Sequence, residues 1–283
     1  MRTMSDAVIN AKAAKGPLVY RQSRWTRLTH WLWAICLFFL MGSGLQIFNA
    51  HPTLYIGEQS GFEYDNAVLD IGLGADGSEN IGVTTVFGRT FNTTGVLGLS
   101  GSSSLTQEER AFPAWATIPS NRSLATGRIV HFFFAWTLLI TLAIWLIAGI
   151  INGHVKRDLV PTIADIKGLP KDIADHARLR FHHTKEYNVL QKFAYGSVLF
   201  VMLPLMILTG LTMSPNFNSF FPFLLDLFGG RQTARTIHFI VMLLLIGFFV
   251  VHMLMILAAG PINELRSIIT GWYRVDATDK EEV

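Results

Sequence analysis

Four segments of the chain are apolar on every face and contain no Asp, Glu, Lys or Arg. A helix needs about 20 apolar residues to cross the hydrocarbon core of a bilayer, and a soluble core helix is rarely apolar all round. We therefore predict an all-α integral membrane protein in which four helices form a transmembrane bundle. The four segments comprise residues 31–48, 129–151, 193–213 and 236–262.

Pro204 interrupts the third apolar segment. Proline lacks the amide hydrogen of a regular helical turn, and membrane helices tolerate it because neighbouring groups can satisfy the freed carbonyl. We therefore predict a kink near Pro204.

The longest polar connection joins the first two apolar segments and covers residues 49–126. It contains ten glycines and eight acidic residues. β-Branched and aromatic residues bounded by glycine at 81–91 indicate a short hairpin. A connection of this length is usually functional or disordered, so docking of a partner and plain disorder both remain open. The second long connection, 152–190, mixes both signs of charge and is typical of a solvated surface helix.

Lys and Arg are distributed unevenly between the two sides of the predicted membrane. Alternate connections carry seventeen on the side of the termini and six on the other side. Positive residues favour the cytoplasmic side, so we predict cytoplasmic tails at 1–27 and 263–283 around a membrane domain at 28–262. Residues 49–126 are then periplasmic and residues 152–190 are cytoplasmic, in the inner membrane of a bacterium.

The chain has a single cysteine, Cys36, which lies inside the first apolar segment. Iron–sulfur clusters and c-type haems need several cysteine thiolates or a C-x-x-C-H motif. One cysteine excludes both within this chain. The pI near 9.1 mostly reflects the uneven distribution of positive charge, and we infer no nucleic-acid partner from it.

Nine histidines occur, and four of them lie in or at the edge of the apolar segments: His30, His131, His238 and His252. Ionisable residues at membrane depth are costly and are functional by default. The other five lie outside the apolar segments, where an exposed side chain is the ordinary role, and they stay unassigned: His51, His154, His176, His182 and His183.

Helix direction sorts the four histidines into two layers. His131 and His238 begin the second and fourth helices on the outer side, whereas His30 and His252 lie on the cytoplasmic side. Fourteen residues on one helix advance about 1400°, so His238 and His252 lie within about 40° of one face and about 21 Å apart. Two imidazoles per layer suit a haem iron, whereas zinc sites want more ligands and di-iron sites want carboxylates. Glycines in these helices allow either a close macrocycle or close helix packing.

Five elements in order resemble the bacterial cytochrome b family that anchors nickel–iron hydrogenases, respiratory formate dehydrogenases and thiosulfate reductases. The resemblance covers most of the chain. The elements are Arg27-Leu-Thr-His30-Trp31, Gly127-Arg-Ile-Val-His131, Tyr187-Asn188-Val-Leu-Gln191-Lys192, the pair His238 and His252, and Asn263-Glu-Leu-Arg-Ser-Ile-Ile-Thr-Gly271-Trp272.

The resemblance implies two non-covalent b haems held by the four histidines. They would move electrons of a respiratory chain between a periplasmic oxidoreductase and the membrane quinone pool. In relatives the segment that opens the third helix helps to form a quinone site, which implies roles for Asn188 and Gln191. An amide there can hydrogen-bond a quinone carbonyl, yet Asn188 can equally cap the helix.

The first outer connection is far longer than in the formate dehydrogenase relative. The resemblance to longer-loop members, described as cytochrome b/b6-domain proteins, implies a periplasmic partner that depends on a molybdenum cofactor. A stand-alone membrane oxidoreductase for a small molecule such as superoxide or ferric iron is the alternative, and a haem-free anchor is a third interpretation. Catalysis in the first two would belong to the haems and the quinone.

Overall fold

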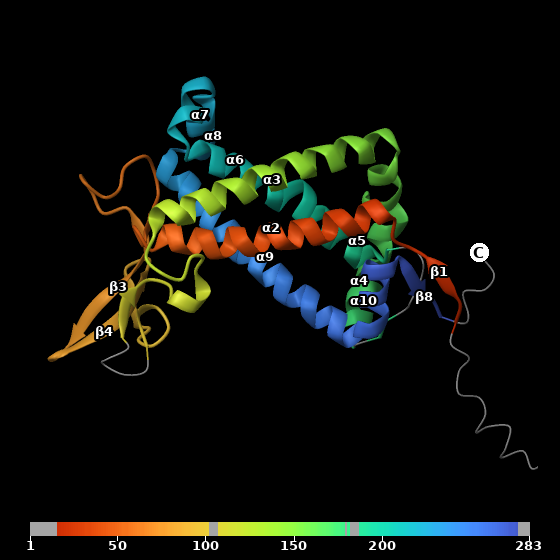
Figure 1. The fold of residues 1–283 in the computed structure, drawn as a ribbon, viewed down its shortest axis with the longest axis horizontal. Coiled ribbons are helices and arrows are strands. Elements are labelled where there is room, and N and C mark those ends of the chain that lie inside the picture. The colour runs from red at the N-terminus through yellow and green to blue at the C-terminus, as the bar shows by residue number, and fades with distance from the viewer. Residues whose placement is uncertain (1–15, 102–106, 179, 182–186, 277–283) are drawn as a thin grey trace, which may run out of the picture. The chain divides into compact units, whose positions relative to one another are not determined.

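The computed structural model describes residues 16–101, 107–178, 180–181 and 187–276. Four of its helical segments are long and apolar enough to cross a membrane, as predicted. In the last segment, only 6% of an apolar stretch of 18 residues is buried inside the molecule. Its exposed apolar surface is suited to lipid. The segments are α2 (Arg24–Phe48), α3 (Leu124–Ile151), Val189–Thr212 and α9 (Arg231–Ala259) (Figure 1).

The third span is irregular around Pro204. It consists of α5 (Val189–Ser197), the π-helical turn η3 (Val198–Met202) and α6 (Leu203–Thr212). Pro204 cannot donate to the carbonyl four residues earlier, and its ring crowds that carbonyl. The carbonyl belongs to Phe200, inside η3, so the disturbance predicted near Pro204 takes the form of a wider turn.

The chain between α2 and α3, predicted as the long outer connection 49–126, is folded mainly as β-structure, so the prediction of an all-α chain was wrong there. A four-stranded antiparallel sheet has the order β2-β3-β4-β5. The hairpin predicted at 81–91 is confirmed, because β4 pairs with β5 from Val83↔Asn92 to Val86↔Arg89. The strands are β2 (Thr53–Tyr55), β3 (Ala67–Asp76), β4 (Glu79–Val86) and β5 (Arg89–Asn92).

The physical reason for this β-structure is visible in the packing. Alternate residues of a strand point to opposite faces, and the inward ones, Leu54 and Ile71, form a buried cluster with Phe48 and Ala111. Phe239 of α9 packs against the same cluster. A segment rich in glycine and acidic residues therefore folds because a few apolar side chains reach the ends of the spans.

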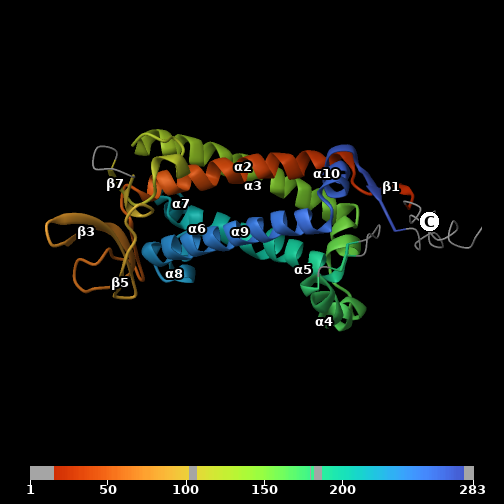
Figure 2. The same cartoon turned by 90° about the horizontal axis from the view of Figure 1, so that it is seen from below.

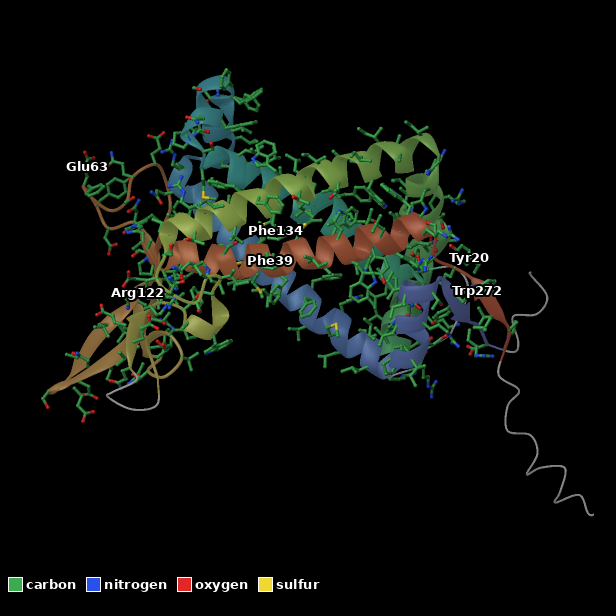
Figure 3. All side chains as sticks on the ribbon, in the orientation of Figure 1. Tyr20, Phe39, Glu63, Arg122, Phe134 and Trp272 are labelled. Atoms are coloured by element: carbon green, nitrogen blue, oxygen red, sulfur yellow. The ribbon has the colours of Figure 1, made fainter. Side chains whose placement is uncertain are left out.

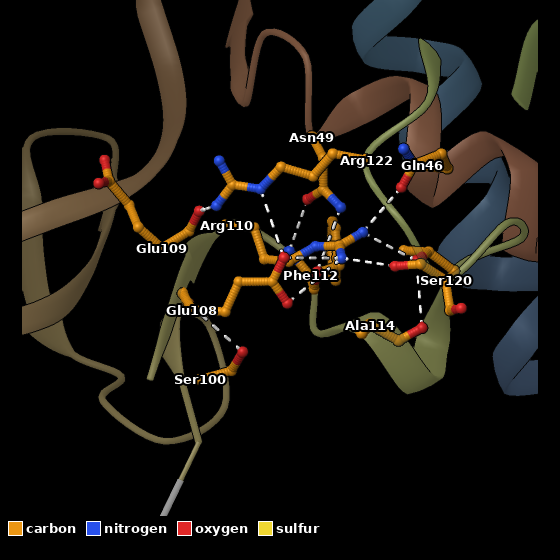
Figure 4. Close-up of polar contacts among 11 residues, drawn as sticks. Gln46, Asn49, Ser100, Glu108, Glu109, Arg110, Phe112, Ala114, Ser120 and Arg122 are labelled. Atoms are coloured by element: carbon orange, nitrogen blue, oxygen red, sulfur yellow. Dashed lines mark hydrogen bonds and ion pairs between the residues drawn. The ribbon is translucent and has the colours of Figure 1, made fainter. Parts of the chain in front are cut away.

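A second small sheet pairs β6 (Gly98–Ser100) with β7 (Glu108–Arg110), and the 3₁₀ turn η1 (Ala114–Ala116) follows it. Arg110 at the end of β7 is 5% exposed. Figure 4 shows its guanidinium between Gln46 of α2 and the carbonyl of Ser120. Its Nη2 donates to Gln46 Oε1 at 2.7 Å and to Thr117 Oγ1 at 2.9 Å.

The described parts of the predicted tails are folded. β1 (Leu18–Tyr20) pairs antiparallel with β8 (Trp272–Arg274), and Tyr20 packs edge-on against Trp272 (Figure 3). α10 (Pro261–Thr270) precedes β8. The surface helix predicted in the connection 152–190 is confirmed as α4 (Ile163–Ala177), which lies beside α5 (Figure 2). The remaining short helices are η2 (Val155–Leu159), α7 (Pro215–Phe220) and α8 (Phe223–Phe228).

The chain divides into two compact units. The tail unit comprises the described parts of residues 1–31, 145–199 and 247–283, and the sheet unit comprises those of 32–144 and 200–246. Within the sheet unit, α2 packs on α3 through Phe39 and Phe134, whose rings stack with centroids 4.3 Å apart (Figure 3). Each unit contains two of the four membrane histidines.

Candidate haem sites

The sheet unit brings His131 of α3 and His238 of α9 face to face. Their ring centroids are 6.4 Å apart and their planes are inclined by 56°. This is the pairing predicted for the outer layer. Neither side chain is a surface group, since the helices on either side supply contacts to both rings.

Two hydroxyl groups orient these imidazoles. Ser43 Oγ lies 3.1 Å from His131 Nδ1, and Thr209 Oγ1 lies 3.0 Å from His238 Nδ1. Each hydroxyl also donates its single hydrogen to a carbonyl of its own helix, that of Phe39 at 2.6 Å or that of Leu205 at 2.7 Å. Each hydroxyl oxygen therefore accepts a hydrogen bond from the histidine Nδ1–H. This tautomer leaves the Nε2 lone pair free for a metal.

A glycine follows each of these hydroxyl residues. A Cβ placed on Gly44 would lie 3.5 Å from His131 Cε1, and a Cβ on Gly210 would lie 3.5 Å from His238 Cε1. Ser43-Gly44 of α2 therefore contacts the His131 ring in the same way as Thr209-Gly210 of α6 contacts the His238 ring. Sequence reasoning missed Ser43 and Thr209, although the repeated hydroxyl–glycine pattern in two predicted spans was a usable signal.

The tail unit brings His30 of α2 and His252 of α9 together. Their ring centroids are 6.5 Å apart with planes inclined by 50°. Phe248 stacks on His252, and Trp31 lies edge-on to His30. His30 Nδ1 is buried and has no hydrogen-bond partner among the residues that the structure describes. The second predicted pair is therefore also assembled, but with aromatic neighbours in place of hydroxyl groups.

Both separations fit a haem iron between two imidazoles. A metal–imidazole bond is about 2 Å long and the ring centre lies about 1 Å beyond the nitrogen, so two rings on opposite sides of one iron have centroids about 6 Å apart. The observed values of 6.4 and 6.5 Å match this requirement. Within the described part of the chain, no three His, Cys, Asp or Glu side chains gather as they would around one metal ion.

Asn188 is the N-cap of α5. Its Oδ1 accepts a hydrogen bond from Gln191 N at 2.8 Å, and Gln191 Oε1 accepts one from Asn188 N at 3.2 Å. This reciprocal capping box uses the acceptor atoms of both side chains. It leaves the amide nitrogens, Asn188 Nδ2 and Gln191 Nε2, as the donors that could reach a quinone carbonyl.

His176 of α4 lies against this cap, which sequence reasoning did not anticipate. Asn188 Nδ2 is 3.3 Å from His176 Nε2, and His176 Nδ1 is 2.8 Å from the carbonyl of Asp172. His176 therefore donates through Nδ1 and accepts through Nε2. Asp172 also accepts from Leu190 N at 3.1 Å, which ties α4 to the start of α5.

An ion pair holds α4 to α5 next to this cap. Lys192 Nζ lies 3.0 Å from Asp165 Oδ2. The backbone N–H of Thr162 lowers the pKa of Asp165 most strongly, and Lys192 adds to the effect. The carboxylate is therefore ionised at neutral pH and holds Lys192 by an ion pair near the first residues of the third span.

Two further histidines of the described ranges lie against aromatic rings. His51 stacks on Tyr55, and burial together with Arg235 lowers its pKa. His154 packs edge-on against Trp145. His182 and His183 lie outside the described residues.

A family model described as prokaryotic cytochrome b561 matches residues 21–271. The chain belongs to the prokaryotic cytochrome b561 family. This confirms the family resemblance stated on the five sequence elements. As a member of this family, the chain is a multi-pass bacterial membrane protein that binds haem b and takes part in electron transfer.

One curated relative of this cytochrome b561 protein comes from Azospira oryzae and carries the name of a protein-methionine-sulfoxide reductase subunit, YedZ1. The two are 31% identical over 130 residues. The alignment covers 44% of this chain and 62% of the relative, so the chain spans less than two thirds of the relative's length. No solved structure matches the chain at a significant level.

The hydroxyl contact to His238 leads to a first prediction for this cytochrome b561 protein. Thr209→Val removes the acceptor for Nδ1–H, and losing such a supporting hydrogen bond typically weakens metal binding by about 10- to 100-fold. We expect faster loss of one haem when the purified variant is mixed with a haem-scavenging apoprotein.

Thr212→Val is the matched control for this prediction. Thr212 is on the same helix, is equally buried and donates to its own helix carbonyl, that of Leu208, at 2.8 Å. It should therefore retain haem as the wild type does. Equal retention by both variants would contradict a role for the Thr209 hydroxyl in haem binding.

Proposed function

We propose that this protein is a di-haem b subunit that transfers electrons between an oxidoreductase partner and the quinone pool of the membrane. The observation that carries the proposal is the presence of two histidine pairs, each with the ring separation that a haem iron requires. α9 contributes one member of each pair, and α2 and α3 contribute the others. Four separate side chains in two such pairs have no use in a haem-free anchor.

The residues of the chain would bind and orient the cofactors. Haem supplies reversible one-electron chemistry when bound. His131 and His238 would ligate through Nε2, because their Nδ1–H groups are held by Ser43 and Thr209. An imidazole whose Nδ1–H is hydrogen-bonded is a more basic ligand. The two pairs therefore offer different ligand strengths, which would give two distinguishable haem potentials.

The quinone site would lie at the start of α5. In support, Asn188 and His176 place an amide donor and an imidazole side by side at the boundary of a span. A quinol gives up two electrons and two protons when it becomes a quinone, and the Asn188 amide would donate a hydrogen bond to the carbonyl that forms. Gln191 would hold Asn188 in place through the capping box.

The partner would dock on the folded segment between α2 and α3. The eight acidic residues of this segment outnumber its three arginines. Arg110 and Arg122 are already paired with Glu108. The excess of acidic groups suits a partner with a basic face. The relative is named as a subunit of a reductase, and we propose a periplasmic partner that depends on a molybdenum cofactor.

Orientation gives a second prediction. The distribution of Lys and Arg supports cytoplasmic termini and a periplasmic β-segment. Alkaline phosphatase inserted at Gly77, in the open turn between β3 and β4, should be active because the enzyme folds only in the periplasm. An insertion at Gly168 in α4 should be inactive. An active fusion at Gly168 with an inactive fusion at Gly77 would show that the proposed topology is reversed.

The proposed function is tested by asking which electron donor reduces the haem. A short-chain quinol added to the purified, oxidised protein should reduce the haem, as seen in the visible spectrum. Reduction of the haem by superoxide, which is itself oxidised to dioxygen, with no reduction by the quinol, would instead support the stand-alone oxidoreductase. Affinity purification from native membranes should recover a molybdenum-containing oxidoreductase, and recovery of the cytochrome alone would count against the partner.

A further inference from the structure

Residues 113–119 run back along a membrane-spanning helix after the β-strands have ended. Ile118 N donates to the carbonyl of Gly42 at 3.0 Å. A Cβ on Gly42 would lie 2.7 Å from the Ile118 side chain, so the two segments are in close contact. Gly42 precedes the end of α2 at Phe48 by six residues. At 1.5 Å per residue this is about 9 Å along the helix axis.

Polar contacts occur on α2 at Gln46, which is closer to the end of this helix than Gly42. Arg110 binds Gln46 through its guanidinium (Figure 4). A Cβ on Gly127 would lie 3.0 Å from Gln46 Cγ, which places the neighbouring Arg128 of α3 near this level. Arg128 is exposed, and an exposed arginine marks the polar boundary of a bilayer rather than its interior. Ile118 is about one helical turn beyond this boundary, on the apolar side.

Several backbone polar groups of residues 113–120 have hydrogen-bond partners within the protein. The amides of Ala116 and Thr117 donate to the carbonyls of Pro113 and Ala114, and Ile118 N is bound to α2. The carbonyl of Ser120 accepts from Arg110 at 2.8 Å. Non-helical backbone survives at membrane depth only when its polar groups are satisfied inside the protein. These contacts meet that requirement at three successive amides.

One side chain leaves this packed segment. Pro113 and Thr117 are buried, and Ala114 and Ile118 are partly buried, but Trp115 is 85% exposed. Exposing an indole to water forfeits a large apolar area. Tryptophan is enriched where a membrane meets water, because its ring is apolar and its N–H remains polar. The position of the segment along α2 and the exposed indole of Trp115 both indicate the interface between membrane and water.

We propose that residues 113–119 form an interfacial segment embedded in the leaflet on the side of the β-sheets, with the Trp115 indole inserted among phospholipids. The segment goes beyond the proposed electron transfer, because it binds the bilayer itself. It fixes the β-strands at a set height on the membrane. It also covers α2 at Gly42.

A fluorescent probe attached through cysteine tests the lipid contact in the full-length protein. The native Cys36 is fully buried, so the unmodified protein serves as the unlabelled background. Trp115→Cys and Phe62→Cys are labelled separately with an environment-sensitive fluorophore and placed in phospholipid nanodiscs. Phe62 is the matched control, because it is an aromatic residue of the sheet unit that is 87% exposed.

The probe at position 115 should be quenched about threefold more strongly by phospholipids spin-labelled near the headgroup than the probe at position 62. Aqueous iodide should show the opposite preference. Equal quenching by iodide at both positions, with no quenching by lipid, would overturn the proposal. Shielding of position 115 that needs a co-purified protein rather than lipid would also overturn it and make Trp115 part of a protein interface.

A second variant tests the path of the segment. Gly42→Leu, combined with Trp115→Cys, places a side chain where Ile118 now packs. The segment should leave α2, and lipid quenching at position 115 should fall to the level at position 62. Unchanged lipid quenching would show that contact with Gly42 does not position the segment. The measurement needs neither haem nor quinone, so its failure leaves the proposed electron transfer untouched.

Discussion

His131→Ala and His252→Ala are each expected to lower the haem content of the purified protein from two haem b per chain to one. Each substitution removes one imidazole from a different pair, while the partners His238 and His30 remain. A haem that two histidines would hold then loses one of its two protein ligands. The measurement is the haem-to-protein ratio combined with reduced-minus-oxidised spectra.

The design separates the two pairs and includes a histidine that lies in neither. His51→Ala is the control, since His51 is outside the spans and stacks on Tyr55. It should keep both haems. The double variant His131→Ala with His252→Ala should bind none. A ratio of one in the wild type, or an unchanged ratio in both single variants, would show that the pairing of imidazoles in the structure does not correspond to two haem sites.

Asn188→Asp and Asn188→Ala are expected to slow reduction of the haem by a quinol about 2- to 12-fold, because a single hydrogen bond between neutral groups contributes about 0.5–1.5 kcal/mol. Aspartate keeps the oxygen that caps α5 but loses the amide donor that faces His176. Alanine loses both. The measurement is the stopped-flow rate of haem reduction by a quinol analogue, with haem spectra recorded in parallel.

Stability distinguishes the two substitutions. Loss of an N-cap costs about 1 kcal/mol, so Asn188→Ala should lower the unfolding temperature, whereas Asn188→Asp should keep it. Thr162→Ala is the matched control, because Thr162 caps α4 through the same kind of capping box. It should lose stability without a slower quinol reaction. Normal kinetics in Asn188→Asp would mean that Asn188 acts only as a helix cap.

Positions along the chain were sufficient to predict the histidine pairs. Helix direction alternates from span to span, and the spacing of His238 and His252 places both on one face of a helix. The structure has both of the resulting pairs. Because hydrophobic length, helical period and alternating direction are local or additive properties, they can be read from one sequence. The family resemblance, now confirmed, rests on these histidines and on the elements 187–192 and 263–272.

The segment between α2 and α3 could not be predicted in the same way. Its inward residues Leu54 and Ile71 have partners that are distant in sequence, Ala111 and Phe239. The hairpin at 81–91 was predictable because its pairing is local, whereas β2 joins the sheet only through long-range contacts. Glycine and acidic composition suggested a loop, and burial against the ends of the spans decided otherwise.

The sequence by itself determined that this protein has four spans apolar enough to cross a membrane, two histidine pairs and a single cysteine inside the first span, because each follows from residue type and spacing. Only the tertiary structure decided which groups surround those histidines. Ser43 and Thr209 reach His131 and His238 from other helices, and Ile118 reaches Gly42 from a segment beyond the β-strands. Such contacts depend on how helices rotate and pack against one another, which the pattern along a single helix does not specify.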